Sequence, residues 1–133
     1  MAIQLSVAVR NARLDAIETV ISTTAKLLIY SGSAPADCAA AASGTLLATL
    51  TLPSDYFAAA GSGAKAKTGT WTGTASAGSA ASPTHFRLAD NAGTTIGLQG
   101  TAGVGSGDLS FDGTITSGQT ITVGTFTLTD ANA

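Results

Sequence analysis

The sequence predicts an all-β domain, an antiparallel β-sandwich of jelly-roll or Ig-like type, preceded by a single α-helix. Two observations predict it. Short segments of alternating apolar and polar residues recur at intervals of about ten residues, which is typical of sandwiches and barrels. Turn-forming Gly, Pro, Asn and Asp separate these segments, and 16 of the 133 residues are Gly. We expect an N-terminal arm and helix over residues 1–23 and a sheet domain over residues 24–133.

Residues 6–22 are the one stretch with the periodicity of a long helix. At about 100° per residue its side chains separate into a broad apolar arc and a polar flank. The arc holds Val7, Leu14, Ile17, Val20 and Ile21, and the flank holds Asn11, Asp15 and Glu18. Ser6 is a suitable N-cap, and the hydroxyl and β-branched residues that follow Ile21 disfavour further helix.

Two arginines, Arg10 and Arg13, project from within the apolar arc of this helix. A buried guanidinium needs a partner, so two interpretations stay open. The arginines lie along the sheet with their charged ends in water, or this face meets another protein chain, where Arg is enriched. The second interpretation predicts a protein interface made of Arg10, Arg13, Leu14, Ile17, Val20 and Ile21. Deleting residues 1–22 and measuring assembly would separate the two.

Strands are expected over residues 26–30, 45–52, 67–76, 84–89, 94–100, 108–111 and 125–129. In the second of these, Leu46, Ala48, Leu50 and Leu52 are expected to share one face. Trp71, the only tryptophan, is expected to anchor a core or an interface.

The strongest strand signal is a hairpin formed by residues 84–89 and 94–100. Its turn, residues 90–93, contains Asn and Gly, which tolerate the positive φ angles of tight turns. Phe86 and Leu88 are expected to face the core, which leaves His85 and Arg87 on the solvent side.

The composition excludes several classes of partner. Charged residues are 11% of the chain and the formal net charge is −2, which argues against nucleic acid because phosphate binding needs a basic surface. No apolar run approaches the roughly 20 residues of a membrane span. The N-terminus lacks the pattern of a signal peptide, so we expect synthesis and folding in a cytoplasm.

The titratable residues do not form the pattern of an active site. His85 is the only histidine and no Gly-x-Ser-x-Gly elbow accompanies it. Most of the aspartates fall at expected turns, where Asp bonds its own backbone. Cys38 is the only cysteine, so neither an internal disulfide nor a Cys/His metal cluster is expected. We therefore expect no catalysis, no cofactor and no metal.

Carbohydrate binding is the strongest alternative to a purely structural role. An exposed aromatic ring beside loop carboxylates is the usual arrangement, and Tyr30, Tyr56 or Trp71 could supply the ring. Each of the three also has a simpler role in packing.

Several stretches resemble small virion structural proteins of tailed bacteriophages, which are rich in Ala, Thr and Gly. They are residues 27–37 and 43–50, the helical stretch 10–17, the hairpin stretch 86–90 and the closing stretch 117–123. The resemblance spans most of the chain, although these motifs are structural ones. It implies a component of the virion without catalysis, made in the bacterial host cytoplasm.

The residues and the resemblance together lead to two expectations for the place of the chain in the particle. The first is a capsid decoration or cement protein, which stabilises the shell as a homo-oligomer through contacts with the major capsid protein or other virion proteins. The second is a tail or head-fibre subunit that binds carbohydrate on the host surface. Adding the protein back to emptied heads separates them, because only a cement protein should raise resistance to heat.

Overall fold

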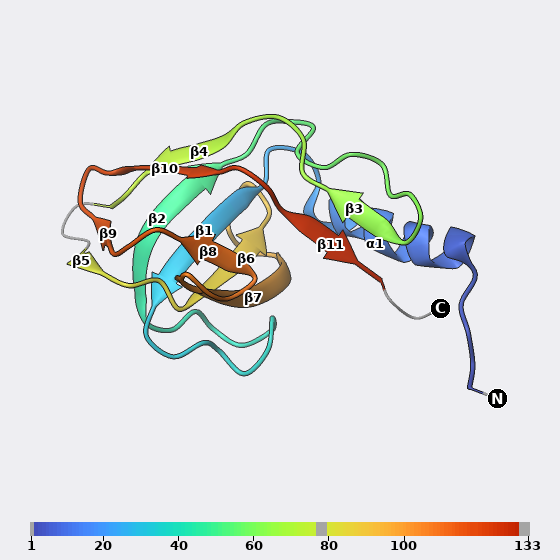
Figure 1. Cartoon of the computed structure of the whole chain (residues 1–133), viewed down its shortest axis with the longest axis horizontal. Coiled ribbons are helices and arrows are strands. Elements are labelled where there is room, and N and C mark those ends of the chain that lie inside the picture. Colours follow the sequence, from blue (N-terminus) through green and yellow to red (C-terminus); the bar gives the residue numbers. More distant parts are fainter. Residues whose placement is uncertain (1, 77–79, 131–133) are drawn as a thin grey trace.

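The computed structural model describes residues 2–76 and 80–130 (Figure 1). Over these ranges the chain forms one helix and eleven strands. They are α1 (Val7–Ile21), β1 (Lys26–Ser31), β2 (Thr45–Thr51), β3 (Ala64–Ala66), β4 (Trp71–Thr74), β5 (Ala80–Ala81), β6 (His85–Ala89), β7 (Ile96–Val104), β8 (Leu109–Phe111), β9 (Ile115–Thr116), β10 (Thr120–Val123) and β11 (Thr127–Thr129). The prediction of a β-dominated fold with one helix is confirmed.

Helix α1 begins and ends where the sequence predicts. The Ser6 hydroxyl accepts a hydrogen bond from the Val9 N–H at 3.2 Å, which satisfies one of the free donors of the first turn. At the other end Ser22 takes a φ of 67° and donates its N–H to Glu18 O at 2.8 Å. A positive φ at a residue other than Gly is uncommon and turns the chain sharply out of the helix.

The main sheet has the strand order β2-β1-β6-β7-β8. Its pairs are antiparallel except the last, in which β7 and β8 run parallel. Strand β4 continues the sheet beside β2, through a bridge between Ala48 and Ala75, and β10 pairs with β4. The β4–β10 pair is a ladder of its own that this bridge connects to the main sheet, so the strands follow one another as β10-β4-β2-β1-β6-β7-β8 in a strongly curled arrangement (Figure 1).

Two short pairs complete the described structure. Strand β11 pairs with β3 beside α1, and β5 pairs with β9 at the far end of the molecule (Figure 1). Helix α1 contacts both β3 and β7.

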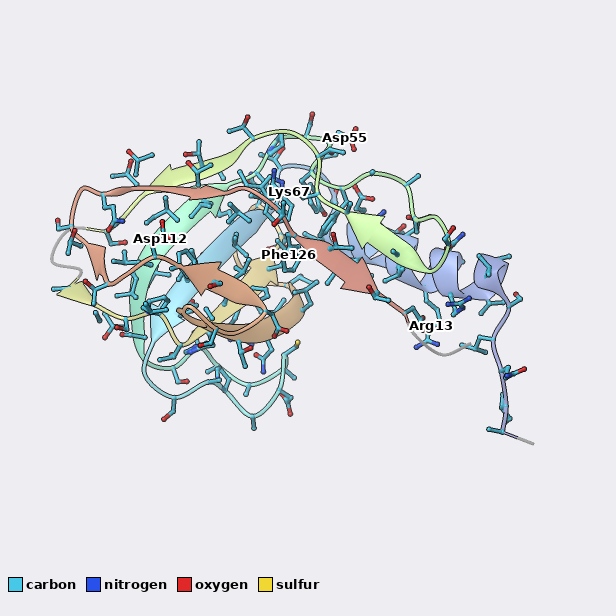
Figure 2. The ribbon with its side chains drawn as sticks, viewed as in Figure 1. Arg13, Asp55, Lys67, Asp112 and Phe126 are labelled. Carbon is cyan, nitrogen blue, oxygen red and sulfur yellow. The ribbon has the colours of Figure 1, made fainter. Side chains whose placement is uncertain are left out.

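The core is a cluster of aromatic rings enclosed by the curled sheet. Trp71 is fully buried, so it is a core anchor as expected, and its ring centroid lies 5.4 Å from that of Phe57. Phe126 sits where β10 leads into β11 and contacts the rings of Phe57, Trp71 and Phe86 at 5.6–6.1 Å (Figure 2). Stacked, tilted and edge-to-face contacts are all present in this cluster, and aromatic pairs favour such geometries.

The predicted hairpin is confirmed as β6 and β7, which pair from His85 opposite Thr101 to Ala89 opposite Ile96. In its turn the Asp90 carboxylate accepts the Thr94 N–H at 2.8 Å, and Gly93 takes a φ of 77°. Strand β7 runs four residues beyond the expected end at residue 100.

The expected face of β2 is partly wrong. Leu46 is 37% exposed, whereas Leu47 is fully buried beside Ala48, Leu50 and Leu52. The register of β1 against β2 shifts between Ile29 and Tyr30. An irregularity of this kind reverses the facing of the residues beyond it, and strict alternation does not anticipate it.

The expected exposure of His85 and Arg87 is also wrong, because they are only 1% and 2% exposed. They do face away from Phe86 and Leu88, but the loop over residues 32–44 covers this side of the sheet and accepts hydrogen bonds from Arg87. The sheet is therefore buried on both faces here, whereas the alternation was interpreted as half-buried.

Candidate assembly surface on the N-terminal helix

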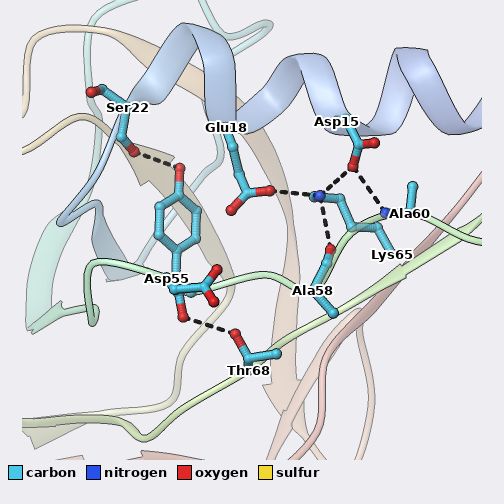
Figure 3. Close-up of polar contacts among 9 residues, drawn as sticks. Asp15, Glu18, Ser22, Asp55, Ala58, Ala60, Lys65 and Thr68 are labelled. Carbon is cyan, nitrogen blue, oxygen red and sulfur yellow. Dashed lines mark hydrogen bonds and ion pairs between the residues drawn. The ribbon is translucent and has the colours of Figure 1, made fainter.

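Helix α1 is held to strand β3 by a lysine that is completely buried. The Lys65 ammonium group, from β3, donates to Asp15 Oδ1 at 2.5 Å, to Ala58 O at 2.9 Å, and lies 2.6 Å from Glu18 Oε2 (Figure 3). Asp15 and Glu18 are three residues apart on the helix, so both carboxylates point to the same side. All three hydrogens of the ammonium group thus have an acceptor.

The charges of this cluster support one another. Burial alone would lower the pKa of Lys65, but its hydrogen bonds with Asp15 and Glu18 and their negative charges outweigh burial and raise that pKa above its ordinary value. The hydrogen bond from Lys65, followed by the one from the Ala60 N–H, lowers the pKa of Asp15. Lysine and aspartate are therefore both ionised over a wide range of pH.

Further bonds fix the helix along its length. Asn11 Oδ1 accepts the Gly63 N–H and Asp15 Oδ1 accepts the Ala60 N–H, each at 2.9 Å. At the end of the helix the Tyr56 hydroxyl donates to Ser22 O at 2.8 Å (Figure 3). Burial, with a contribution from the Glu18 charge, raises the pKa of Tyr56 to about 12. The polar flank of the helix, formed by Asn11, Asp15 and Glu18, therefore attaches the helix to the rest of the chain.

Both arginines of the helix find partners within the chain, at Asp130. Arg10 Nη1 donates to Asp130 O at 3.0 Å, and Arg13 Nε lies 3.2 Å from Asp130 Oδ2. Arg10 is half-buried, whereas the Arg13 side chain is 57% exposed. The end of β11 is thereby tied to the first half of α1, beside Arg13 in Figure 2.

The six residues of the predicted interface divide between two sides of the helix. Leu14 and Ile21 are buried against the chain's own sheet, and Ile17 packs partly against the same core. Val20 is 61% exposed, and Arg13 is exposed beside it on the outward side. Of the six residues, Val20 is thus exposed without a role in the core, whereas Arg13 is exposed but paired with Asp130 and Arg10 is half-buried against the same residue.

Sequence reasoning missed a second apolar stripe, on the outward side of α1. Val9, Ala12, Ala16 and Val20 are all exposed and follow one another at intervals of three or four residues. With Arg13 they form what we call the outer helix face. Its spacing is visible in the sequence, but the prediction considered only the broad apolar arc that holds Leu14, Ile17 and Ile21.

A second buried cation lies on the far side of the sheet. Arg87 Nη2 donates to the carbonyl oxygens of Cys38 and Ala40 at 2.8 and 2.9 Å. The His85 ring stacks on Tyr30, with centroids 5.1 Å apart. Burial, and then the Arg87 charge, lowers the pKa of His85. Among the described residues these groups join the covering loop to the sheet, and Thr84 is the neighbour of the His85 Nδ1 atom at 3.0 Å.

The other predicted kinds of site have these positions in the structure. Tyr30, Tyr56 and Trp71 are 7%, 1% and 0% exposed, so none offers an open ring to a sugar. Within residues 2–76 and 80–130, no three His, Cys, Asp or Glu side chains gather as a metal site. No helix in those ranges is both long and apolar enough to cross a membrane.

Comparison of the chain with models of protein families, with curated proteins and with solved structures finds no match.

Proposed function

We propose that this chain is a structural protein of a tailed-bacteriophage virion, and that it serves there as a capsid decoration protein. After synthesis in the host cytoplasm it would bind in many copies to the major capsid protein. The contact would be made by the outer helix face, with the sheet domain standing above the shell.

This proposal rests on one observation: α1 has an exposed apolar face, and its opposite side is bonded to the rest of the chain. Val9 and Val20 are 46% and 61% exposed, yet the opposite side of the same helix is locked to the body through Lys65. Exposed apolar surface on a fixed element is typical of interaction sites. A preorganised helix also loses little conformational freedom on binding, which favours affinity.

The finer fold assignment belongs to the same proposal. The curled arrangement would then fold over as a β-sandwich, in which β4 and β10 form a second layer joined to the main sheet beside β2, with the rings of Trp71, Phe86 and Phe126 between the layers. A role in carbohydrate binding has less support, because the three aromatic residues that could stack on a sugar are buried.

The test is an add-back experiment with heads that lack this chain. Purified protein should raise the temperature at which such heads release their DNA, and Val20→Glu should abolish the effect because it places a charge in the contact. Val104→Glu is a matched control, since Val104 is 45% exposed on β7 at a distance from the helix.

Three results would count against the proposal. They are heads whose heat resistance the wild-type protein leaves unchanged, equal activity of the two variants, and a loss of host adsorption without any change in shell stability. The last result would favour the fibre subunit instead.

A further inference from the structure

The curled sheet has an open seam between its two outermost strands. Strands β8 and β10 lie on either side of two cavities of about 300 and 260 Å³, which residues 107–113 and 119–125 line together with Ile115. Strand pairing links β8 to β7 and β10 to β4, and among the described residues no ladder joins β8 to β10. Each strand therefore presents one unpaired edge to the seam.

The backbone groups that face the seam follow from the ladders. Phe111 O accepts the Gly105 N–H, so the peptide groups of Leu109 and Phe111 point toward β7 and those of Ser110 toward the seam. In β10, Gln119 O accepts the Ala75 N–H, so this peptide group points toward β4. Because the direction alternates along a strand, the peptide groups of Thr120 and Thr122 point toward the seam. Both edges thus offer donors and acceptors with the spacing that an added strand requires.

Both strands also share one side-chain pattern. Leu109-Ser110-Phe111 and Ile121-Thr122-Val123 each read apolar, polar, apolar, and their apolar members face the core whereas Ser110 and Thr122 are exposed. A strand that filled the seam would need the same alternation to continue both faces of the sheet.

The N-terminal arm of the chain has this pattern. Residues 3–5 read Ile-Gln-Leu, residues 2–6 precede α1 without helix or strand, and Ile3 is 87% exposed. Four residues of extended chain span about 13 Å, and β10 is also four residues long. The arm leaves the helix at the end of the molecule opposite to β8 and β10 (Figure 1).

We infer that the seam is a strand-addition site and that its occupant is the arm, residues 2–5, of a second copy of this chain. The arm enters as a strand between β8 and β10, places Ile3 and Leu5 over the core beside Phe111 and Val123, and completes the sheet. Each copy then both donates an arm and accepts one, so the exchange links copies to one another without using the outer helix face.

The experiment measures the exchange directly on the purified chain, with no tag at its N-terminus. Two variants are made in a Cys38→Ser background: Gln4→Cys, in the arm, and Thr122→Cys, in the seam. A mixture of the two, treated with a short bifunctional maleimide, should give a covalent dimer that joins the two variants. Thr45→Cys replaces Thr122→Cys in the control mixture, because Thr45 is an exposed residue of β2, which β4 separates from β10 and the seam.

Light scattering provides the second measurement. The full chain should be oligomeric, and both removal of residues 2–5 and Thr122→Pro should make it monomeric with an unchanged melting temperature. Proline at position 122 removes the N–H that faces the seam, and with it the Thr122 hydroxyl, which lies 3.2 Å from the exposed Thr72 hydroxyl. The inference is overturned if the full chain is monomeric, if both variants keep its oligomeric state, or if the control mixture crosslinks equally. A shell-binding assay is not involved, so this result is independent of the proposed function.

Discussion

The two buried cations of this protein are held in opposite ways. Lys65 is fully buried between two carboxylates, and the negative charge of Asp15 and Glu18 exceeds its own. Arg87 is equally buried, but it donates to the carbonyl oxygens of Asp37, Cys38 and Ala40. One cation is neutralised by ions and the other is solvated by peptide dipoles.

This difference matches what each cation holds in place. The Lys65 cluster joins a helix to a strand fifty residues away, and its carboxylates reach water at the helix surface, with side chains 46% and 29% exposed. Arg87 holds a loop over residues 32–44 that is rich in Ala and has few apolar side chains to pack. A planar guanidinium with several donors can gather carbonyl groups of such a loop, which a single ammonium does less well.

The largest effect is expected when the carboxylates of Asp15 and Glu18 are both removed, because Lys65 then has only neutral partners, as Arg87 does. In Asp15→Asn/Glu18→Gln the buried ammonium keeps only neutral partners, and we expect a loss of about 3 kcal/mol in the free energy of unfolding. This is the low end of the usual range because both side chains are partly exposed. Urea denaturation followed by circular dichroism measures it. Asp55→Asn, at an exposed turn, is the control, and equal losses in the two would mean that the ion cluster does not hold the helix.

The matching change on the other side is Arg87→Met. This variant removes the buried charge and leaves no charge unpaired. We expect a loss of about 2 kcal/mol in the free energy of unfolding, because the loop carbonyl groups lose their hydrogen-bond donor. Amide hydrogen exchange at residues 38–42 should rise more than at any strand of the main sheet. Arg87→Lys should restore part of the protection. Unchanged exchange in the loop would contradict the assigned role of Arg87.

A smaller effect is expected from a change of pH, which titrates His85 near Arg87 and Asp15 beside Lys65. Burial lowers the pKa of His85, so between its ordinary value near 6.5 and its folded value the unfolded chain binds more protons. Stability therefore rises with pH through this window and falls as the solution is acidified from about pH 7 to pH 5. The contribution of Asp15, whose pKa is also lowered, is lost only below about pH 4.

The variant His85→Phe separates these two windows. It keeps a ring to stack on Tyr30 and removes the titrating group, so its denaturation midpoint should stay level from about pH 7 to pH 5 while the wild type declines. A parallel decline in both proteins would assign the pH dependence to another residue.

The two clusters also explain which parts of the structure could be predicted from sequence. The helix and the β6–β7 hairpin are local, because the Ser6 cap and the Asp90 turn determine them within a few residues. The exposure of Asp15, Glu18 and Arg87 is not local. Arg87 was expected on the solvent side and is covered by the loop over residues 32–44, while nothing in the sequence indicates that Asp15 and Glu18 pair with Lys65, which lies fifty residues after Asp15. The prediction that Leu46 shares a face with Ala48 was wrong for a related reason. The irregular register involves β1 and β2 together, so the sequence of one strand does not show it.

The smallest expected effect comes from the ion pair on the surface of the same helix. The Arg13 side chain is 57% exposed and its Nε lies 3.2 Å from Asp130 Oδ2, whose side chain is 10% exposed. Because water reaches the guanidinium, we expect this pair to be worth at most about 1 kcal/mol, as surface pairs are. We expect Arg13→Gln to change the free energy of unfolding by no more than about 0.5 kcal/mol, and raising the salt concentration from about 0.1 M to 1 M should remove even this difference. The buried Lys65 cluster should respond far less to salt. If Arg13→Gln instead loses as much stability as Asp15→Asn/Glu18→Gln, the tie between α1 and the end of β11 would be what mounts the helix, and the buried lysine would be secondary.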